Sequence, residues 1–308
     1  MRISSAFAYD KQLSQLQRRQ SQLTEAQTQL TSGKRVLRAS DDPAAAATAE
    51  RALARMSRAE AQARALDASK NAMQLTESAL GDAGEMLQQV REALVNAGNG
   101  SYTDSDRQKL ADQIRGLRND LLAVANRDDG SGRYLFGGQG SDTPPLRDTP
   151  AGVVYDGLAG QANAAAGEET PLAIDGRAAF LQVPDPANPG ATVSVFDALD
   201  QAVAGLLTPG QSGTQIAQIV STGIGNVDAA MNNFASARAR AGEALNRADG
   251  MSERLSQTKL DAETERSNAT DLDMLAAISD FQNRQTGYDA ALKTYSMVQR
   301  MSLFDYLK

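Results

Sequence analysis

The amino-acid sequence predicts a mainly α-helical protein. We expect an elongated rod of long antiparallel helices, with coiled-coil-like helices at both ends of the chain and a small β-rich domain inserted between them. Three observations predict this fold. Apolar residues recur every seven positions in several long segments. Aromatic residues make up only 5% of the 308 residues, which is little material for one large globular core. Finally, turn-forming residues gather in one central stretch.

The first predicted element is a helix near the N-terminus. Four leucines fit the a and d positions of a heptad repeat: Leu13, Leu16, Leu23 and Leu30. Gln20 and Gln27 occupy the intervening a positions, so the predicted seam is narrow and contains polar residues. Gly33 suits the position just after a helix that ends near Ser32, because glycine adopts the left-handed conformation easily.

A short linker follows this helix, within the stretch LTSGKRVLRASDDPAAAA at residues 30–47. Pro43 suits the first position of a new helix, where its missing N–H costs nothing. Asp42 can cap that helix, and Asp41 adds negative charge near the positive end of the helix dipole. We interpret this acid pair as capping residues and not as a catalytic or metal-binding pair.

Long helices are predicted on both sides of the central stretch. The first carries an apolar residue at every seventh position: Leu66, Met73, Leu80, Leu87 and Leu94. It should end at residues 98–100, and another helix capped by Thr103 or Asp104 should stop before residue 128. After the central stretch, helical periodicity returns from about residue 214.

Residues 131–209 have a different pattern. Short apolar runs separated by turn residues predict a β-rich insert, and residues 197–207 predict a short helix. The runs read as strands are YLF, GVVY, PLAI, AAFLQV and ATVSVF.

The last segment has the most aromatic seam. One heptad position holds Met274, Phe281, Tyr288 and Tyr295. Ile278 and Leu292 hold the partner position, which Gln285 and Gln299 interrupt. We interpret this stripe as a packed seam, because its strict spacing is untypical of a cofactor site. The glutamines in both terminal seams either lie on an exposed rim or fix the register between neighbouring subunits.

These elements divide the chain into five predicted segments. The N-terminal core helix and its linker span residues 1–40, and the first half of the rod spans residues 41–130. The β-rich outer domain spans residues 131–209. The second half of the rod spans residues 210–270, and the C-terminal core helix spans residues 271–308. The apolar stripes of the two terminal helices would pack together within and between subunits. Each stripe is narrow, so burying it stabilises its helix by less than the conformational entropy that ordering the helix costs. We therefore expect both ends to become ordered on polymerisation.

The composition also excludes several kinds of chemistry. The chain has no cysteine and no histidine, so disulfides, thiolate nucleophiles, Ser-His-Asp triads and Cys/His zinc sites are excluded. Asp128 and Asp129 precede Gly130 in what we interpret as a turn, because the ligands of a calcium loop are missing. We predict no catalytic residues, no cofactor and no metal.

Charge and hydropathy bear on possible partners. The net charge is −7, yet residues 1–38 hold seven basic and two acidic residues. We interpret the basic excess as a solvated helix face, since no aromatic residues interleave with it as nucleic-acid binding requires. No apolar run approaches the ~20 residues that cross a bilayer. We expect no nucleic-acid partner and no membrane insertion, and no secretory signal is recognisable.

Two stretches resemble a known family. LTSGKRVLRASDDPAAAA resembles the motif that joins the first two helices of the flagellin family, and DMLAAISDFQNRQTGYDAALKTYSMVQRMSLFDYL resembles its C-terminal core helix. The stretch GSGRYLFGGQGSDTPPL and the ending SLFDYL resemble the branch of the family that joins the flagellar hook to the filament.

The resemblance implies an extracellular structural subunit of the bacterial flagellum that forms the hook–filament junction by helical polymerisation through its terminal helices. It implies as partners copies of the chain itself, flagellin, another hook-associated protein, and a cytosolic export chaperone at the C-terminal helix. It also implies type III export without a cleaved signal peptide. Two alternatives remain open at this point: a small flagellin of the filament, and a secreted adhesin whose β-rich insert binds a ligand.

Overall fold

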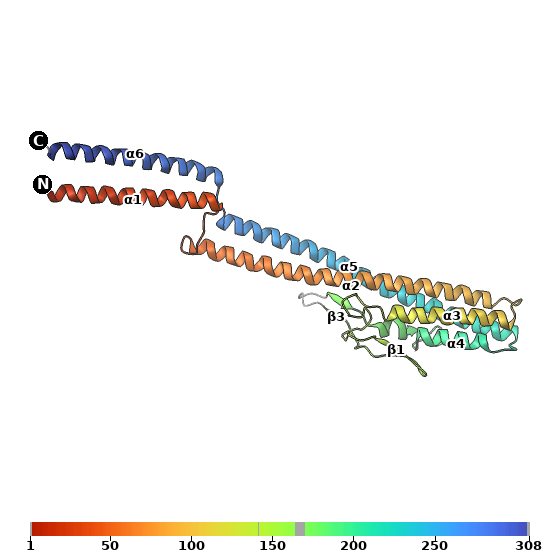
Figure 1. Cartoon of the computed structure of the whole chain (residues 1–308). Helices are drawn as coiled ribbons and strands as arrows, with labels where there is room; N and C mark the ends of the chain where they lie inside the picture. Colours follow the sequence, from red (N-terminus) through yellow and green to blue (C-terminus); the bar gives the residue numbers. More distant parts are fainter. Residues whose placement is uncertain (1, 141, 164–169, 307–308) are drawn as a thin grey trace. The chain divides into compact units, whose positions relative to one another are not determined.

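The computed structural model describes the chain except residues 1, 141, 164–169 and 307–308 (Figure 1). The described chain is mainly helical with a few short strands, as the sequence predicts. It splits into two compact units. The terminal unit comprises residues 1–59 and 256–308, and the central unit comprises residues 60–255.

The helices are few and long, and the strands are short. The α-helices are α1 (Arg2–Ser32), α2 (Pro43–Ala97), α3 (Asp104–Ala125), α4 (Val195–Leu207), α5 (Gly213–Thr270) and α6 (Met274–Tyr306). The strands are β1 (Leu146–Thr149), β2 (Gly152–Tyr155), β3 (Ala162–Asn163), β4 (Pro171–Ala173), β5 (Val183–Pro184) and β6 (Thr192–Val193). A π-helical turn, η1, spans Arg177–Leu181.

Capping residues explain where the shorter helices begin. Thr103 caps α3 in a capping box: its side chain accepts from the backbone N–H of Asp106, whose carboxylate accepts from the backbone of Thr103. Ser194 caps α4 in the same position relative to Asp197. Both helices therefore start where the local sequence provides partners for the free N–H groups of the first turn.

In the central unit, α2 and α5 pack antiparallel. Three ion pairs show the direction, because the residue numbers rise along α2 as they fall along α5: Lys70–Asp249 at 2.6 Å, Glu77–Arg238, and Arg91–Asp228 at 2.9 Å. All five members of the seven-residue repeat predicted for α2 are buried. On α5, the matching repeat is buried from Val220 to Ala248. The predicted heptads thus form the long seam of the central unit.

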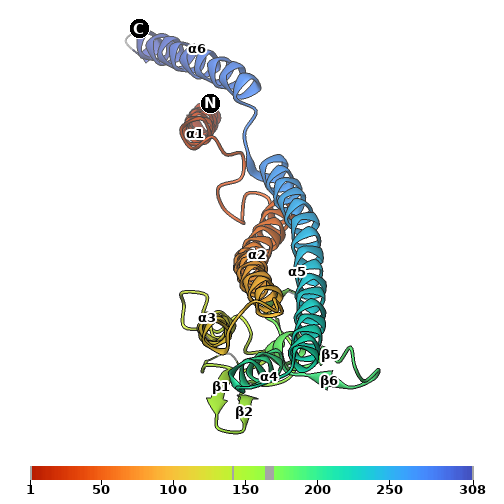
Figure 2. The ribbon, with the colours of Figure 1, turned by 90° about the vertical axis from the view of Figure 1, so that its right-hand side faces the viewer.

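The insert contributes three two-stranded antiparallel sheets. GVVY forms β2, which pairs with β1 in a hairpin that lies beside α3 and α4 (Figure 2), and PLA forms β4. Three predictions of strands were wrong over all or most of their length. YLF forms only an isolated bridge at Tyr134 and continues as a turn. AAFL forms the turn η1, and only its Val183 end is a strand; in ATVSVF, only Thr192–Val193 is a strand, because α4 begins at Val195.

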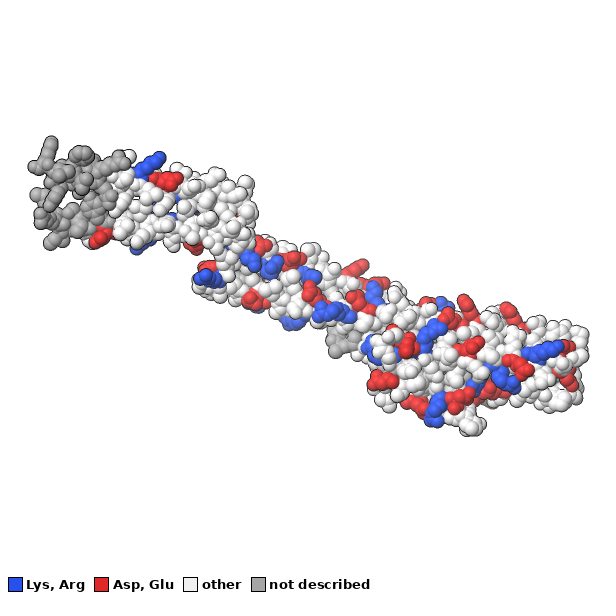
Figure 3. Space-filling view, viewed as in Figure 1, with Lys and Arg blue, Asp and Glu red and all other residues white. Residues whose placement is uncertain are grey.

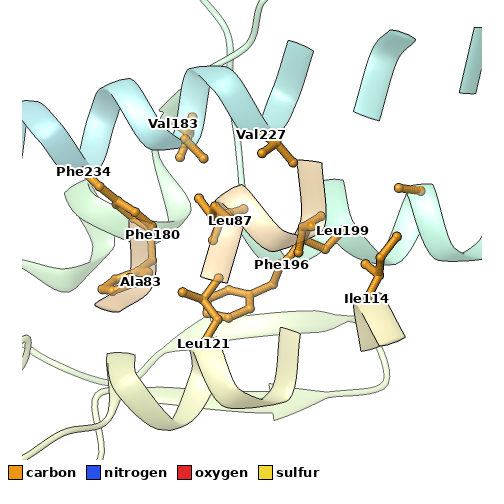
Figure 4. Packing of buried hydrophobic residues seen from close by; sticks show 14 of the residues in the cluster. Ala83, Leu87, Ile114, Leu121, Phe180, Val183, Phe196, Leu199, Val227 and Phe234 are labelled. Carbon is orange, nitrogen blue, oxygen red and sulfur yellow. The ribbon is translucent and has the colours of Figure 1, made fainter. Parts of the chain in front are cut away.

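The reason for these differences is a phenylalanine cluster. Phe180 of η1 lies 5.0 Å from Phe136, 6.2 Å from Phe196 and 5.1 Å from Phe234, measured between ring centroids. Figure 4 shows Phe180, Phe196 and Phe234 beside Leu87 of α2 and Leu121 of α3. The phenylalanine side chains of these apolar runs pack into the core, while the backbone that carries them is irregular and does not form strands. The scarce aromatic residues are concentrated in this one core.

A buried arginine connects the insert to the helices. Arg118 of α3 pairs with Asp148 of β1 and with Asp200 of α4, and its guanidinium lies 5.5 Å from the centre of the Phe196 ring. Its side chain is only 5% exposed. The two carboxylates raise the pKa of Arg118, Asp148 foremost. The guanidinium of Arg118 thus links the β1–β2 hairpin to α3 and α4.

Hydropathy and surface charge differ along the helices. Among the described residues, none of the helices combines the length and the apolar content that a membrane span requires. Figure 3 shows acidic and basic side chains interspersed over the visible face of the central unit, whereas the described part of α1 and α6 presents a mostly uncharged face.

Candidate assembly interface

The candidate site is the pair formed by α1 and α6 in the terminal unit. The two helices contact each other along their length and run antiparallel, so both termini lie at one end of the pair (Figure 1). On α1, the half-buried side chains include Leu16, Leu23 and Leu30, and Ala26 is fully buried. Three of the four predicted leucines therefore face the seam.

The seam of α6 is built from aromatic and small residues. Phe281, Tyr288 and Tyr295 are half-buried at one heptad position. The alternating position is held by half-buried residues that are small or long and basic: Ala277, Arg284 and Ala291. The predicted aromatic stripe therefore does face α1, but its seam partners are not the predicted Ile278 and Leu292.

Four of the predicted interface residues lie outside this seam. Leu13, Met274, Ile278 and Leu292 are each more than 40% exposed. Of the glutamines predicted at seam positions, Gln20, Gln27 and Gln285 are also exposed, and the side chain of Gln299 lies outside the described residues. On α1, the seam includes the half-buried Gln12 and the buried Ala26, each one residue before the predicted Leu13 and Gln27, whereas Arg19 between them is exposed. The alanines Ala26, Ala277 and Ala291 allow the helices to pack closely at their positions, which leaves the neighbouring Ile278 and Leu292 outside the seam.

Polar contacts set the register between the two helices. The Arg284 Nη1 atom donates a hydrogen bond of 3.3 Å to the main-chain oxygen of Gln22. The Arg19 guanidinium lies against Gly287, where a Cβ atom would come within 2.8 Å of Nη1. Gln12 has its side-chain Oε1 shielded from solvent without a hydrogen-bond partner among the described residues. The seam is thus only partly apolar.

The linkers at the inner end of the pair are joined through their backbones. Gly33 has a φ of +69°, as predicted for a residue that ends a helix. Its main-chain oxygen accepts a hydrogen bond of 2.9 Å from Leu272 N–H, and Thr270 O accepts from the N–H groups of Arg35 and Val36 at 2.8 and 3.3 Å. The segment after α1 is therefore paired with the segment between α5 and α6, and we call this contact the linker clasp.

The side chain of Arg35 adds to the linker clasp. Its Nη2 atom donates a hydrogen bond of 2.7 Å to Ala269 O, and its Nη1 atom lies 3.3 Å from the Asp42 carboxylate. Arg35 thus supplies positive charge at the C-terminal end of α5 and links that end to the start of α2, where negative charge is favourable.

Of the predicted acid pair, Asp42 caps α2 as expected, whereas Asp41 binds the linker before the helix. Asp42 Oδ1 accepts a hydrogen bond of 3.0 Å from Ala45 N–H, and α2 begins at Pro43. Asp41 Oδ2 accepts from the N–H groups of Leu37 and Arg38 at 3.1 and 2.8 Å. The backbone N–H of Arg38 lowers the pKa of Asp41, and that of Ala45 lowers the pKa of Asp42. Both carboxylates therefore organise the linker.

The terminal unit buries very few apolar side chains. Among its described residues, the buried apolar ones are Val36 and five alanines: Ala26, Ala49, Ala52, Ala59 and Ala262. Large apolar side chains are exposed on the same unit, among them Phe7 at 71% and Leu275 at 80%. Within the described part of the chain, the three buried hydrophobic clusters all belong to the central unit. A unit with exposed large and buried small apolar residues is typical of a surface that another molecule covers.

Sequence reasoning missed the second half of the linker clasp. Residues 269–272 contribute mainly backbone groups, and such contacts leave no pattern in the sequence. The side chain of Arg35 reaches Ala269, a contact that no local pattern indicates. Among the described residues, the structure shows no group of three or more acidic, histidine or cysteine side chains with the arrangement of a metal site.

Comparison with known proteins gives matches at both ends of the chain. Residues 3–141 match the model of the bacterial flagellin N-terminal helical region, and residues 224–307 match that of the bacterial flagellin C-terminal helical region. A flagellar hook-associated protein 3 from Escherichia coli K12 is 30% identical over 244 residues, which cover 76% of this chain and 77% of that protein.

Solved structures share the fold at lower sequence identity. One is a putative flagellar hook-associated protein from Vibrio parahaemolyticus, which is 20% identical, has a TM-score of 0.65, and matches over 75% of this chain and all of its own. Another is the flagellar junction protein FlgL from Legionella pneumophila, which is 19% identical, has a TM-score of 0.53, and matches over 60% of this chain and 93% of its own.

Proposed function

The chain belongs to the flagellin family, and on that premise we propose that it is the structural subunit that forms the junction between the flagellar hook and the filament. The similarity to hook-associated protein 3 extends over three quarters of both chains, which supports this branch of the family over a filament subunit. The protein acts by forming interfaces, as a part of the bacterial flagellum.

One observation in the structure carries the mechanism. The terminal unit presents large apolar side chains to solvent while it buries little more than alanine. Because burial of an exposed leucine or isoleucine is worth roughly 1.5–3 kcal/mol, association of several such units gains stability that one unit alone lacks. Polymerisation through the terminal helices would cover this surface. The central unit has its own core and needs no such partner.

The partners follow from this position in the flagellum. The subunit contacts copies of itself, flagellin on the filament side and another hook-associated protein on the hook side. Before assembly, the exposed apolar residues of α6, such as Leu275 and Ile278, need a cover in the cytosol, and a chaperone bound to the C-terminal helix supplies it. The chain then passes through the flagellar type III export route to the cell exterior.

Loss of the gene tests this function. We expect cells that keep intact hooks, lack attached filaments and release flagellin monomers into the medium. Restoring the full-length chain should restore filaments, whereas a chain without residues 1–10 should stay soluble and fail to do so. A chain without residues 186–190, in the exposed turn between β5 and β6, is the matched control and should assemble. Normal filaments in the absence of the gene would contradict the proposal.

A further inference from the structure

The α1–α6 pair has two flanks of different chemistry. Consecutive residues of an α-helix are rotated by about 100°. In two antiparallel helices, the residues that directly follow seam residues such as Ala26 and Ala277 therefore turn to the same side of the pair. On α1 and α6 these residues form what we call the apolar flank: Leu13, Gln20, Gln27, Ile278, Gln285 and Leu292.

The register between α1 and α6 places the residues of the apolar flank in pairs, one from each helix, at the same level along the helix axes. The contacts Arg284–Gln22 and Arg19–Gly287 place each residue of α1 beside a defined residue of α6. Counting from these contacts, Leu13 lies level with Leu292, Gln20 with Gln285, and Gln27 with Ile278. The flank thus alternates apolar and amide side chains, and it carries no charge.

The opposite side is the polar flank. It contains the residues that directly precede the leucines of α1 and the aromatic residues of α6, among them Gln15, Gln22 and Asp280. The arginines Arg19 and Arg284 extend toward this side, because Arg284 reaches the backbone of Gln22 and Arg19 lies against Gly287. Asp280 accepts from Arg284 Nε at 2.7 Å.

We propose that, in the assembled junction, the apolar flank of one copy packs against the polar flank of the next copy. This inference rests on the proposed function, because it assigns the partner of the terminal helix pair. A contact between two different faces repeats from copy to copy and builds a ring or helix, whereas a contact of one face with itself stops at a dimer.

Two features favour a second copy as the occupant of the apolar flank. Leu13, Ile278 and Leu292 are 46%, 44% and 41% exposed, although they border directly on an interface that is already formed. Their neighbours are glutamines, and a buried amide needs a partner that both donates and accepts hydrogen bonds.

The polar flank can supply both what the exposed apolar side chains need, a cover, and what the glutamines need, hydrogen-bond partners. Gln15 and Gln22 repeat at the same seven-residue interval as Gln20 and Gln27, so amides can pair with amides between copies. The aliphatic stems of Arg19 and Arg284 lie along the same side, and such stems cover apolar surface while their charged ends stay hydrated.

Cysteine cross-linking in flagella tests the pairing, because the chain has no cysteine of its own. Cells would produce two differently tagged copies, one with Gln20→Cys and the other with Gln15→Cys or Gln22→Cys. We expect disulfide-linked heterodimers in the isolated flagella, with a yield at least about tenfold above that of a control pair, because proximity raises the effective thiol concentration. The control combines Gln20→Cys with Ser21→Cys, which lies on the face of α1 that is turned away from α6.

Two results would overturn the inference. Homodimers of the Gln20→Cys chain in equal yield would show that the apolar flank contacts itself. Heterodimers no more abundant than in the control, in flagella that contain both chains, would show that the two flanks do not meet. Absence of the unmodified chain from isolated flagella is a separate result, which would contradict the proposed function and the inference with it.

Discussion

The Nη2 atom of Arg35 donates a hydrogen bond of 2.7 Å to the main-chain oxygen of Ala269, which lies 234 residues further along the chain. This contact joins the linker after α1 to the end of α5, next to the backbone hydrogen bonds between Gly33, Arg35 and the segment 270–272. The segments that carry α1 and α6 are therefore joined at their inner ends, so we expect order in α1 and order in α6 to depend on each other.

The substitution Arg35→Ala tests this dependence. It removes the hydrogen bond to Ala269 and the ion pair with Asp42, and because Arg35 is half exposed we expect a modest loss of about 1 kcal/mol. Hydrogen exchange at the Leu272 amide, which donates to Gly33, should become about fivefold faster. The control Arg38→Ala, also exposed in this linker, should leave it unchanged. Equal exchange in both variants would contradict a role for Arg35.

The substitution Gln12→Leu should strengthen the helix pair. The Oε1 atom of Gln12 is shielded without a hydrogen-bond partner among the described residues, and such an acceptor costs about 1–3 kcal/mol. We expect slower hydrogen exchange in the middle of α1. Gln15→Leu, at an exposed position of the same helix, is the matched control and should have little effect. Faster exchange in the Gln12 variant would show that this amide stabilises the seam.

The substitution Arg118→Met should destabilise the central unit. Arg118 is the shared partner of Asp148 and Asp200 and lies over the buried Phe196 ring, so its loss leaves both carboxylates without their common cation. Since these carboxylates are partly exposed, we expect a loss of about 2 kcal/mol in the free energy of unfolding by urea. Arg118→Lys keeps the charge but cannot bind both partners with a planar fork, so it should recover only part of the loss. Unchanged stability in Arg118→Met would contradict this role.

Acid should destabilise the turn after α3 in a defined pH range. Burial would raise the pKa of Asp129, but hydrogen bonds from Ser131 and Arg133 outweigh it and lower the pKa to about 2. The carboxylate is only 6% exposed. Because the folded value lies below the unfolded value of 3.8, Asp129 contributes stability above about pH 4 that is lost as the pH falls toward 2.

The Asp129 carboxylate contributes about 2 kcal/mol to the free energy of unfolding, and urea unfolding between pH 2 and 5 measures this contribution. In Asp129→Asn, stability should fall less steeply across this range than in the unmodified chain. Asp120→Asn, on the exposed face of α3, should keep the steep dependence. An identical pH dependence in all three proteins would refute the role of Asp129.

The sequence was sufficient to predict the helices because their signals are local. Seven-residue repeats identified α2 and α5, Gly33 marked the end of α1, and Pro43 marked the start of α2. Thr103 was recognised as a candidate cap because capping depends on residues only three positions apart. Each of these features is determined within one or two helical turns.

The remaining features depend on residues that are distant in the chain. The heptad pattern of α1 allows either Leu13 or Gln12 to alternate with Leu16, and only the partner helix decides between them. Ala277 and Ala291 of α6 decide in favour of the close-packed seam. In the same way, Phe180 is drawn into a cluster with Phe136 and Phe234, which a strand assignment from local propensity could not foresee.

The most direct test compares hydrogen exchange of the terminal helices in two states of the same chain. We expect the amides around Leu16, Leu23 and Leu30 to exchange rapidly in the isolated monomer and to become strongly protected in isolated flagella. The amides around Leu87 should be protected in both states. Strong protection of residues 12–30 in a proven monomer would contradict this expectation, because the terminal helices would then be stable without neighbours.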